Sequence, residues 1–73
     1  MIPRYPTSRA VRAVRDNDLC LNTSPVAEIY DAIWDDVACW LSIELRYTDA
    51  GTLCRVDRIT DEAVYRIMNS AVV

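Results

Sequence analysis

Hydrophobic and polar residues recur along this chain with two different periods, and the change falls near its middle. Between residues 24 and 40 the apolar positions return every three or four residues. At ~100° per residue they fill an arc of roughly 140°, with acids on the opposite side. This pattern predicts an amphipathic helix from about residue 24 to about residue 39, capped by Ser24 with Pro25 at its first position. Its apolar stripe contains Val26, Ile29, Tyr30, Ile33, Trp34, Val37, Trp40 and Leu41.

From Leu41 to Tyr47 the apolar residues instead alternate with polar ones, which is typical of a half-buried strand. Thr48 to Gly51 then resembles a four-residue hairpin loop, and residues 52–58 are predicted to form the returning strand. The register that pairs Tyr47 with Thr52 matches apolar with apolar side chains and Glu44 with Arg55. Its other pairs are Leu45 with Cys54, Ile43 with Val56, and Leu41 with Arg58.

Two further segments have helical spacing. From Ser8 to Arg15 the alanines and valines lie opposite Arg9, Arg12 and Arg15, which favours a helix of about two turns over a hairpin within residues 8–22. Thr60 is predicted to cap a last helix that extends to about Ser70. Residues 1–7, with two prolines, are expected to form an extended arm.

These elements predict an α+β domain spanning residues 1–73, in which two or three helices pack on an antiparallel β-hairpin. One alternative remains open. If the central helix continues to Gly51 as its C-terminal cap, the protein is a small all-helical bundle.

The composition of this chain argues against catalysis and cofactor binding. It has no histidine and a single glycine, which removes the commonest general base and any glycine-rich phosphate loop. Adjacent carboxylates such as Asp35 and Asp36 point about 100° apart on a helix and do not converge on one atom. We therefore expect a protein that is not an enzyme and that holds no metal or other cofactor.

The three cysteines, Cys20, Cys39 and Cys54, lack the close spacing of a zinc site or a disulfide framework. They are expected to be reduced core residues in a cytosol. Apolar residues make up 52% of the chain, but no run approaches the ~20 residues that cross a bilayer. No apolar signal region follows the first residues, so we expect a protein that is neither exported nor bound to a membrane.

Charge is distributed unevenly along the chain. Residues 1–15 carry four arginines and no acid, whereas residues 16–73 carry eleven acids and four arginines, within a total charge of −3. The central helix concentrates part of this acidity on one side. An acidic stripe near aromatic residues is suited to binding a basic surface of another macromolecule. The predicted partner-binding residues are Glu28, Asp31, Asp35, Asp36 and Trp34.

The chain is therefore expected to be a protein-binding module that masks a basic, nucleic-acid-binding surface of a partner. Its short, acidic, non-catalytic character is similar to that of phage-encoded or mobile-element inhibitors such as anti-CRISPR proteins, although the similarity lies in composition and covers no specific residues. The expected location is the bacterial cytosol.

The alternative is a small regulatory nucleic-acid-binding or antitoxin-like protein, with a homodimer as one option. Its contacts to phosphate would come from Arg4, Arg9, Arg12 and Arg15. The acidic body disfavours direct binding of a polyanion. A subunit of a larger assembly is the third hypothesis.

Overall fold

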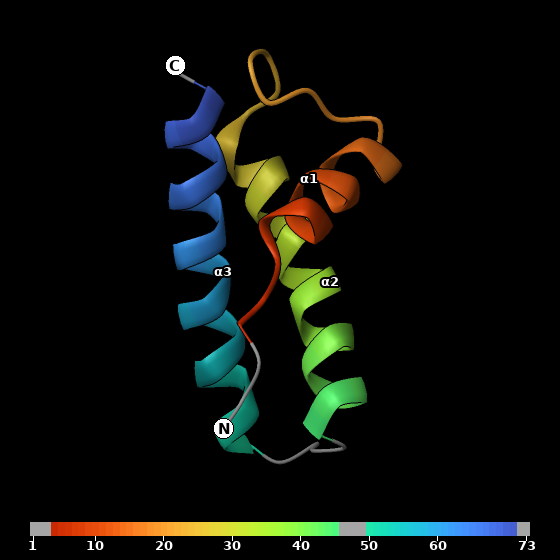
Figure 1. Cartoon of the computed structure of the whole chain (residues 1–73), viewed down its shortest axis with the longest axis vertical. Coiled ribbons are helices and arrows are strands. Elements are labelled where there is room, and N and C mark those ends of the chain that lie inside the picture. Colours follow the sequence, from red (N-terminus) through yellow and green to blue (C-terminus); the bar gives the residue numbers. More distant parts are fainter. Residues whose placement is uncertain (1–3, 46–49, 72–73) are drawn as a thin grey trace.

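The computed structural model describes residues 4–45 and 50–71, and within them the chain forms three helices and no strand. Helix α1 spans Thr7–Asp16, α2 spans Val26–Leu45, and α3 spans Ala50–Ala71. The two long helices lie side by side, and α1 packs across one of their shared faces (Figure 1). The prediction of an α+β domain is wrong, and the described residues form the small all-helical bundle that was the alternative.

The described part of the predicted first strand is helical, and its first residue, Leu41, continues the buried helical stripe of α2. Leu41 is completely buried, in line with Val37 one turn earlier and Ile33 two turns earlier. Ile43, which the hairpin would have placed beside Val56, points to solvent with 62% of its surface exposed. The end of the predicted strand at Tyr47 and most of the loop, residues 46–49, lie outside the described residues.

The predicted second strand is the first half of α3. Val56 starts a buried line that continues through Thr60, Ala63 and Ile67 with helical spacing. Thr60 is therefore in the middle of a helix and does not cap one. Its hydroxyl is fully buried and donates a hydrogen bond to the carbonyl oxygen of Val56 over 2.6 Å. Gly51 belongs to the first turn of α3 and is not a C-terminal cap.

Helix α1 confirms the preference for a helix over a hairpin at this position. It begins at Thr7 after Pro6 and has no side-chain cap, so Ser8 is not its cap. The loop to α2 contains Ser24, whose hydroxyl oxygen accepts a hydrogen bond from the Cys20 amide over 2.8 Å. Helix α2 begins at Val26, so Pro25 precedes its first position, and the amides of Glu28 and Ile29 donate to the Pro25 carbonyl oxygen.

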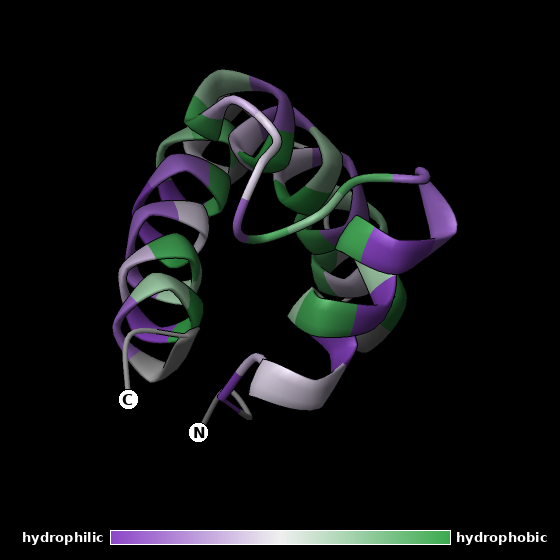
Figure 2. Cartoon of the chain, turned by 90° about the horizontal axis from the view of Figure 1, so that it is seen from above, coloured by the Kyte–Doolittle hydropathy of each residue, from purple (hydrophilic) through white to green (hydrophobic). Residues whose placement is uncertain are grey.

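One core joins the three helices and the segment that precedes them. Hydrophobic residues of the helices face one another and hydrophilic ones face outward (Figure 2). The segment from Arg4 to Pro6 runs between α2 and α3 (Figure 1), and Tyr5 is 3% exposed. Its ring meets that of Trp40 edge to face, with centroids 5.2 Å apart. The largest fully buried side chains are those of Ile29, Ile33, Val37, Leu41, Val56, Thr60 and Ile67.

The cysteines are not core residues. Cys20, Cys39 and Cys54 are all exposed free thiols, so the prediction of burial is wrong. Cys39 lies on the outer side of α2, and Cys54 falls on α3 where the expected strand would have turned it inward.

Candidate functional site

The predicted acidic stripe lies on the exposed side of α2. Glu28, Asp31 and Asp35 are exposed, as expected for positions i, i+3 and i+7 opposite the buried stripe. Within the described residues, none of these three carboxylates takes part in an ion pair. Their charges are thus available to solvent or to a partner.

Helix α3 adds two acids that the sequence prediction missed. The indole N–H of Trp34 donates a 2.8 Å hydrogen bond to Asp57 Oδ1, which fixes the half-buried ring against α3. Tyr30 lies beside it, with its hydroxyl 3.5 Å from the Asp57 carbonyl oxygen. Burial raises the pKa of Tyr30, and the nearby negative charges of Asp61, Asp57 and Asp31 raise it further.

These contacts define a candidate surface that crosses the seam between α2 and α3. Two half-buried aromatic rings, Tyr30 and Trp34, lie between carboxylates from both helices. We call this the acidic surface, and its carboxylates are those of Glu28, Asp31, Asp35, Asp57 and Asp61. Their concentration on one side creates a negative potential that attracts cationic groups.

Asp36, predicted as a partner-binding residue, belongs to the other side of α2. Its carboxylate accepts hydrogen bonds from Arg9 Nε at 2.8 Å and Arg9 Nη2 at 3.4 Å. The Tyr5 hydroxyl also donates to it. Both charged side chains are about one-third exposed, at 36% for Arg9 and 27% for Asp36. Asp36 therefore joins Tyr5 and α1 to α2, and the acidic surface does not include it.

The Tyr5 hydroxyl makes stability sensitive to alkaline pH. Burial raises the pKa of Tyr5 above its ordinary value of 10.0, and the hydrogen bond and negative charge of Asp36 raise it further. The folded chain then holds this proton more tightly than the unfolded chain does. Its contribution to stability is complete below the unfolded pKa and decreases as pH rises through the interval up to the folded pKa.

We expect Tyr5→Phe to abolish this part of the alkaline destabilisation. Between about pH 10 and pH 11.5, the wild-type free energy of unfolding should fall more steeply than that of Tyr5→Phe, by up to about 1.4 kcal/mol per pH unit. Urea denaturation at closely spaced pH values measures both slopes. Equal slopes for the two proteins would show that Tyr5 keeps an ordinary pKa.

The four arginines of the alternative nucleic-acid site are separated by the fold. Arg4 donates to Glu62 on α3 and Arg9 to Asp36 on α2. Arg12 and Arg15 are exposed on α1. Together with Arg9, Asp16 and Asp36, they line an open concavity of about 850 Å³. Two of the four predicted phosphate contacts are thus occupied by the protein's own carboxylates.

The described residues offer no arrangement typical of a metal site, since no group of three or more acidic or cysteine side chains converges there. No helix among the described residues combines the length and apolarity needed to cross a bilayer.

Comparison with known proteins gave no relative from which a function can be transferred: no family model matches the chain, and no curated protein or solved structure matches it significantly.

Proposed function

We propose that this chain is a small, non-enzymatic binding protein whose acidic surface masks a basic surface of another protein in a bacterial cytosol. One observation carries the proposal. Carboxylates from two helices flank Tyr30 and Trp34 without ion pairs in the described residues, whereas Asp36 and Glu62 elsewhere on the molecule are ion-paired.

The aromatic rings of Tyr30 and Trp34 provide binding energy that exposed charges alone do not provide. Exposed charges steer encounter and orient a partner, but most binding energy at protein interfaces comes from a few well-packed side chains, with tryptophan and tyrosine prominent among them. Trp34 is held in place by its hydrogen bond to Asp57, so little conformational entropy is lost when a partner covers it. Arginine side chains of a partner stack favourably on such rings.

A surface that binds phosphate backbones has the complementary chemistry, because it is rich in arginine and lysine. Covering it with carboxylates would exclude the nucleic acid. This is the action we propose for the chain, as an inhibitor of the kind encoded by phages and mobile elements.

Charge reversal at Asp31 is expected to weaken partner binding by at least about tenfold at low salt, since it replaces attraction by repulsion at the centre of the acidic surface. Asp35→Arg should act in the same direction. The partner would first be captured from nuclease-treated host lysate with the wild-type chain and identified. Titration calorimetry at low and high salt would then compare the variants.

Asp16→Arg is the matched control, because it makes the same charge change at an exposed aspartate of α1, outside the acidic surface. It should retain the captured partner. If Asp31→Arg and Asp16→Arg bind that partner equally well, the acidic surface is only a solvated face. Tight, strongly salt-dependent binding of the wild-type chain to DNA or RNA would instead support the nucleic-acid-binding alternative.

A further inference from the structure

A second charged feature lies on the opposite flank of α3. A groove of about 370 Å³ separates the segment before α1 from the exposed side of α3. Tyr5, Ile59 and Ala63 provide an apolar floor. Its charged residues are Arg4, Arg55, Arg58, Glu62 and Arg66, which give four guanidinium groups and one carboxylate, a formal charge of +3.

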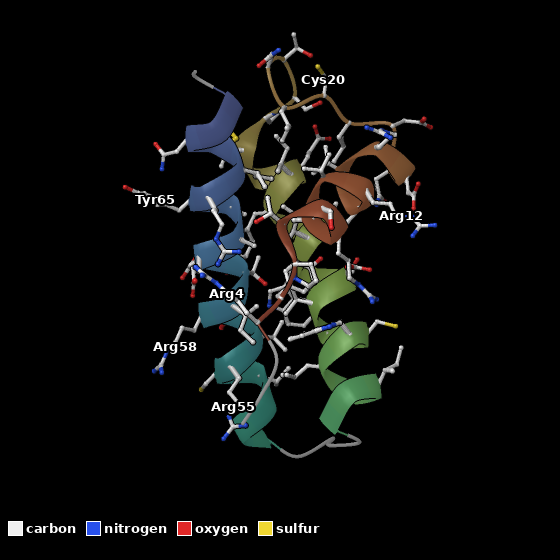
Figure 3. The ribbon with its side chains drawn as sticks, viewed as in Figure 1. Arg4, Arg12, Cys20, Arg55, Arg58 and Tyr65 are labelled. Carbon is white, nitrogen blue, oxygen red and sulfur yellow. The ribbon has the colours of Figure 1, made fainter. Side chains whose placement is uncertain are left out.

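The sequence did not reveal this arginine cluster because its members are separated by up to 62 positions along the chain, from Arg4 to Arg66. Helical spacing places Arg55, Arg58 and Arg66 on one flank of α3. Figure 3 shows Arg55 and Arg58 extending outward from the first half of α3, on the same side of the view as Arg4, whereas Arg12 lies across the molecule.

One end of the groove already binds an anionic oxygen. Glu62 Oε1 accepts hydrogen bonds from Arg4 Nη2 at 2.9 Å and from Arg66 Nη2 at 2.5 Å. These two hydrogen bonds, led by that from Arg66, lower the pKa of Glu62. Arg66 is also held by the Tyr5 carbonyl oxygen at 3.3 Å and the Thr7 hydroxyl oxygen at 3.2 Å. Its guanidinium is therefore fixed in place before any ligand arrives.

The other arginines of the groove have unused capacity. Arg55 and Arg58 are exposed, and within the described part of the chain neither forms an ion pair. Arg4 has only one carboxylate partner there, and its side chain is 73% exposed. All three residues line the groove, so an incoming anion would meet guanidinium groups there without displacing the structural bonds of Arg66.

We propose that this groove binds the diphosphate group of a small-molecule ligand. Guanidinium forks match the oxygens of phosphate, and a diphosphate can balance the charge of +3 that remains after the Glu62 carboxylate is counted. The volume lies within the range of small-molecule sites, toward its lower end. A long nucleic-acid backbone fits less well, because Asp57 and Asp61, which belong to the acidic surface on the other flank of α3, repel phosphates beyond the groove.

Glu62 makes the proposal specific, since its carboxylate competes with the ligand for Arg4. Removing the negative charge with Glu62→Gln should therefore strengthen binding, while removing positive charge with Arg55→Gln and Arg58→Gln together should weaken it. We expect changes of at least about fivefold in each direction at low salt. A surface that attracts anions only through the overall charge of the protein would not distinguish these positions from others.

Isothermal titration calorimetry with inorganic pyrophosphate, at low salt and without divalent cations, tests the groove directly. Arg12→Gln with Arg15→Gln is the matched control, because it removes two exposed arginines from α1 and makes the same change in net charge. Thermal unfolding of each variant verifies that it is folded. The proposal predicts binding to the wild-type chain, weaker binding to the Arg55 and Arg58 variant, and binding to the control close to wild type.

Two further ligands distinguish the sources of the phosphate. Adenosine diphosphate that binds at least as tightly as pyrophosphate supports the proposal. A higher affinity for adenosine diphosphate would indicate that its nucleoside contacts the apolar floor of the groove. A single-stranded oligonucleotide that binds while pyrophosphate does not would overturn it. Absence of pyrophosphate binding, or equal loss in the groove and control variants, would also overturn it. None of these outcomes depends on the acidic surface or its partner.

Discussion

Trp40→Ala is expected to lower the free energy of unfolding by about 3–5 kcal/mol, the usual cost of removing a buried aromatic ring. Trp40 is 3% exposed and packs edge to face against Tyr5. The substitution would leave a cavity where the segment before α1 packs against α2. A domain of this length has a total stability of about 4–11 kcal/mol, so the variant should be partly unfolded near 37 °C.

Thermal unfolding followed by circular dichroism measures this effect, and Tm should fall by more than about 15 °C. Tyr65→Ala is a suitable control, because Tyr65 is 65% exposed on α3. Its substitution should change the free energy of unfolding by less than about 0.5 kcal/mol. Similar losses for the two variants would contradict the packing of Trp40 in the core.

Asp36→Ala is expected to destabilise the fold by about 2–3 kcal/mol, the second largest effect of a single substitution that we predict. The substitution leaves the hydroxyl of Tyr5 without an acceptor in a buried position. It also removes both hydrogen bonds from Arg9, which tie α1 to α2. Most of the cost should come from the orphaned hydroxyl, since the ion pair itself is partly exposed.

A double-mutant cycle with Tyr5→Phe separates these two contributions. If the orphaned hydroxyl dominates, Asp36→Ala should cost less in the Tyr5→Phe background than in the wild type, by about 1–2 kcal/mol. Urea denaturation of the four proteins gives the coupling energy. Asp35→Ala, the neighbouring exposed acid on α2, is the control and should be nearly neutral. Strictly additive effects would mean that Tyr5 and Asp36 do not share a hydrogen bond.

The candidate surfaces were only partly visible in the sequence. The stripe of Glu28, Asp31 and Asp35 follows from helical spacing within one segment, so its position could be predicted before the fold was known. The contribution of Asp57 could not, because that residue was assigned to a strand and its contact with Trp34 joins two helices. The arginine groove was missed for the same reason, since it combines α3 with the N-terminal segment.

Asp36 shows the limit of assigning function from exposure on a single helix. On the helical wheel it borders the acidic stripe and resembles its neighbours. In the structure it is bound by Tyr5 and Arg9, whose positions depend on how residues 4–16 pack against α2. A residue at the edge of an amphipathic face is assigned to the core or the surface by its neighbouring elements, not by its own spacing.

The sequence by itself determined the helical character of the first part of α2, because there the apolar residues fit only one period, and it favoured a helix over a hairpin between Ser8 and Arg15. It also determined which side of α2 carries the exposed acids. After Leu41 the same residues fit both a strand and a helix, and only tertiary packing decided between them. The helix prevailed because continuing α2 buries Leu41, and continuing α3 backwards buries Val56, in a common core. Burial in that core depends on residues distant in the chain, which no local period records.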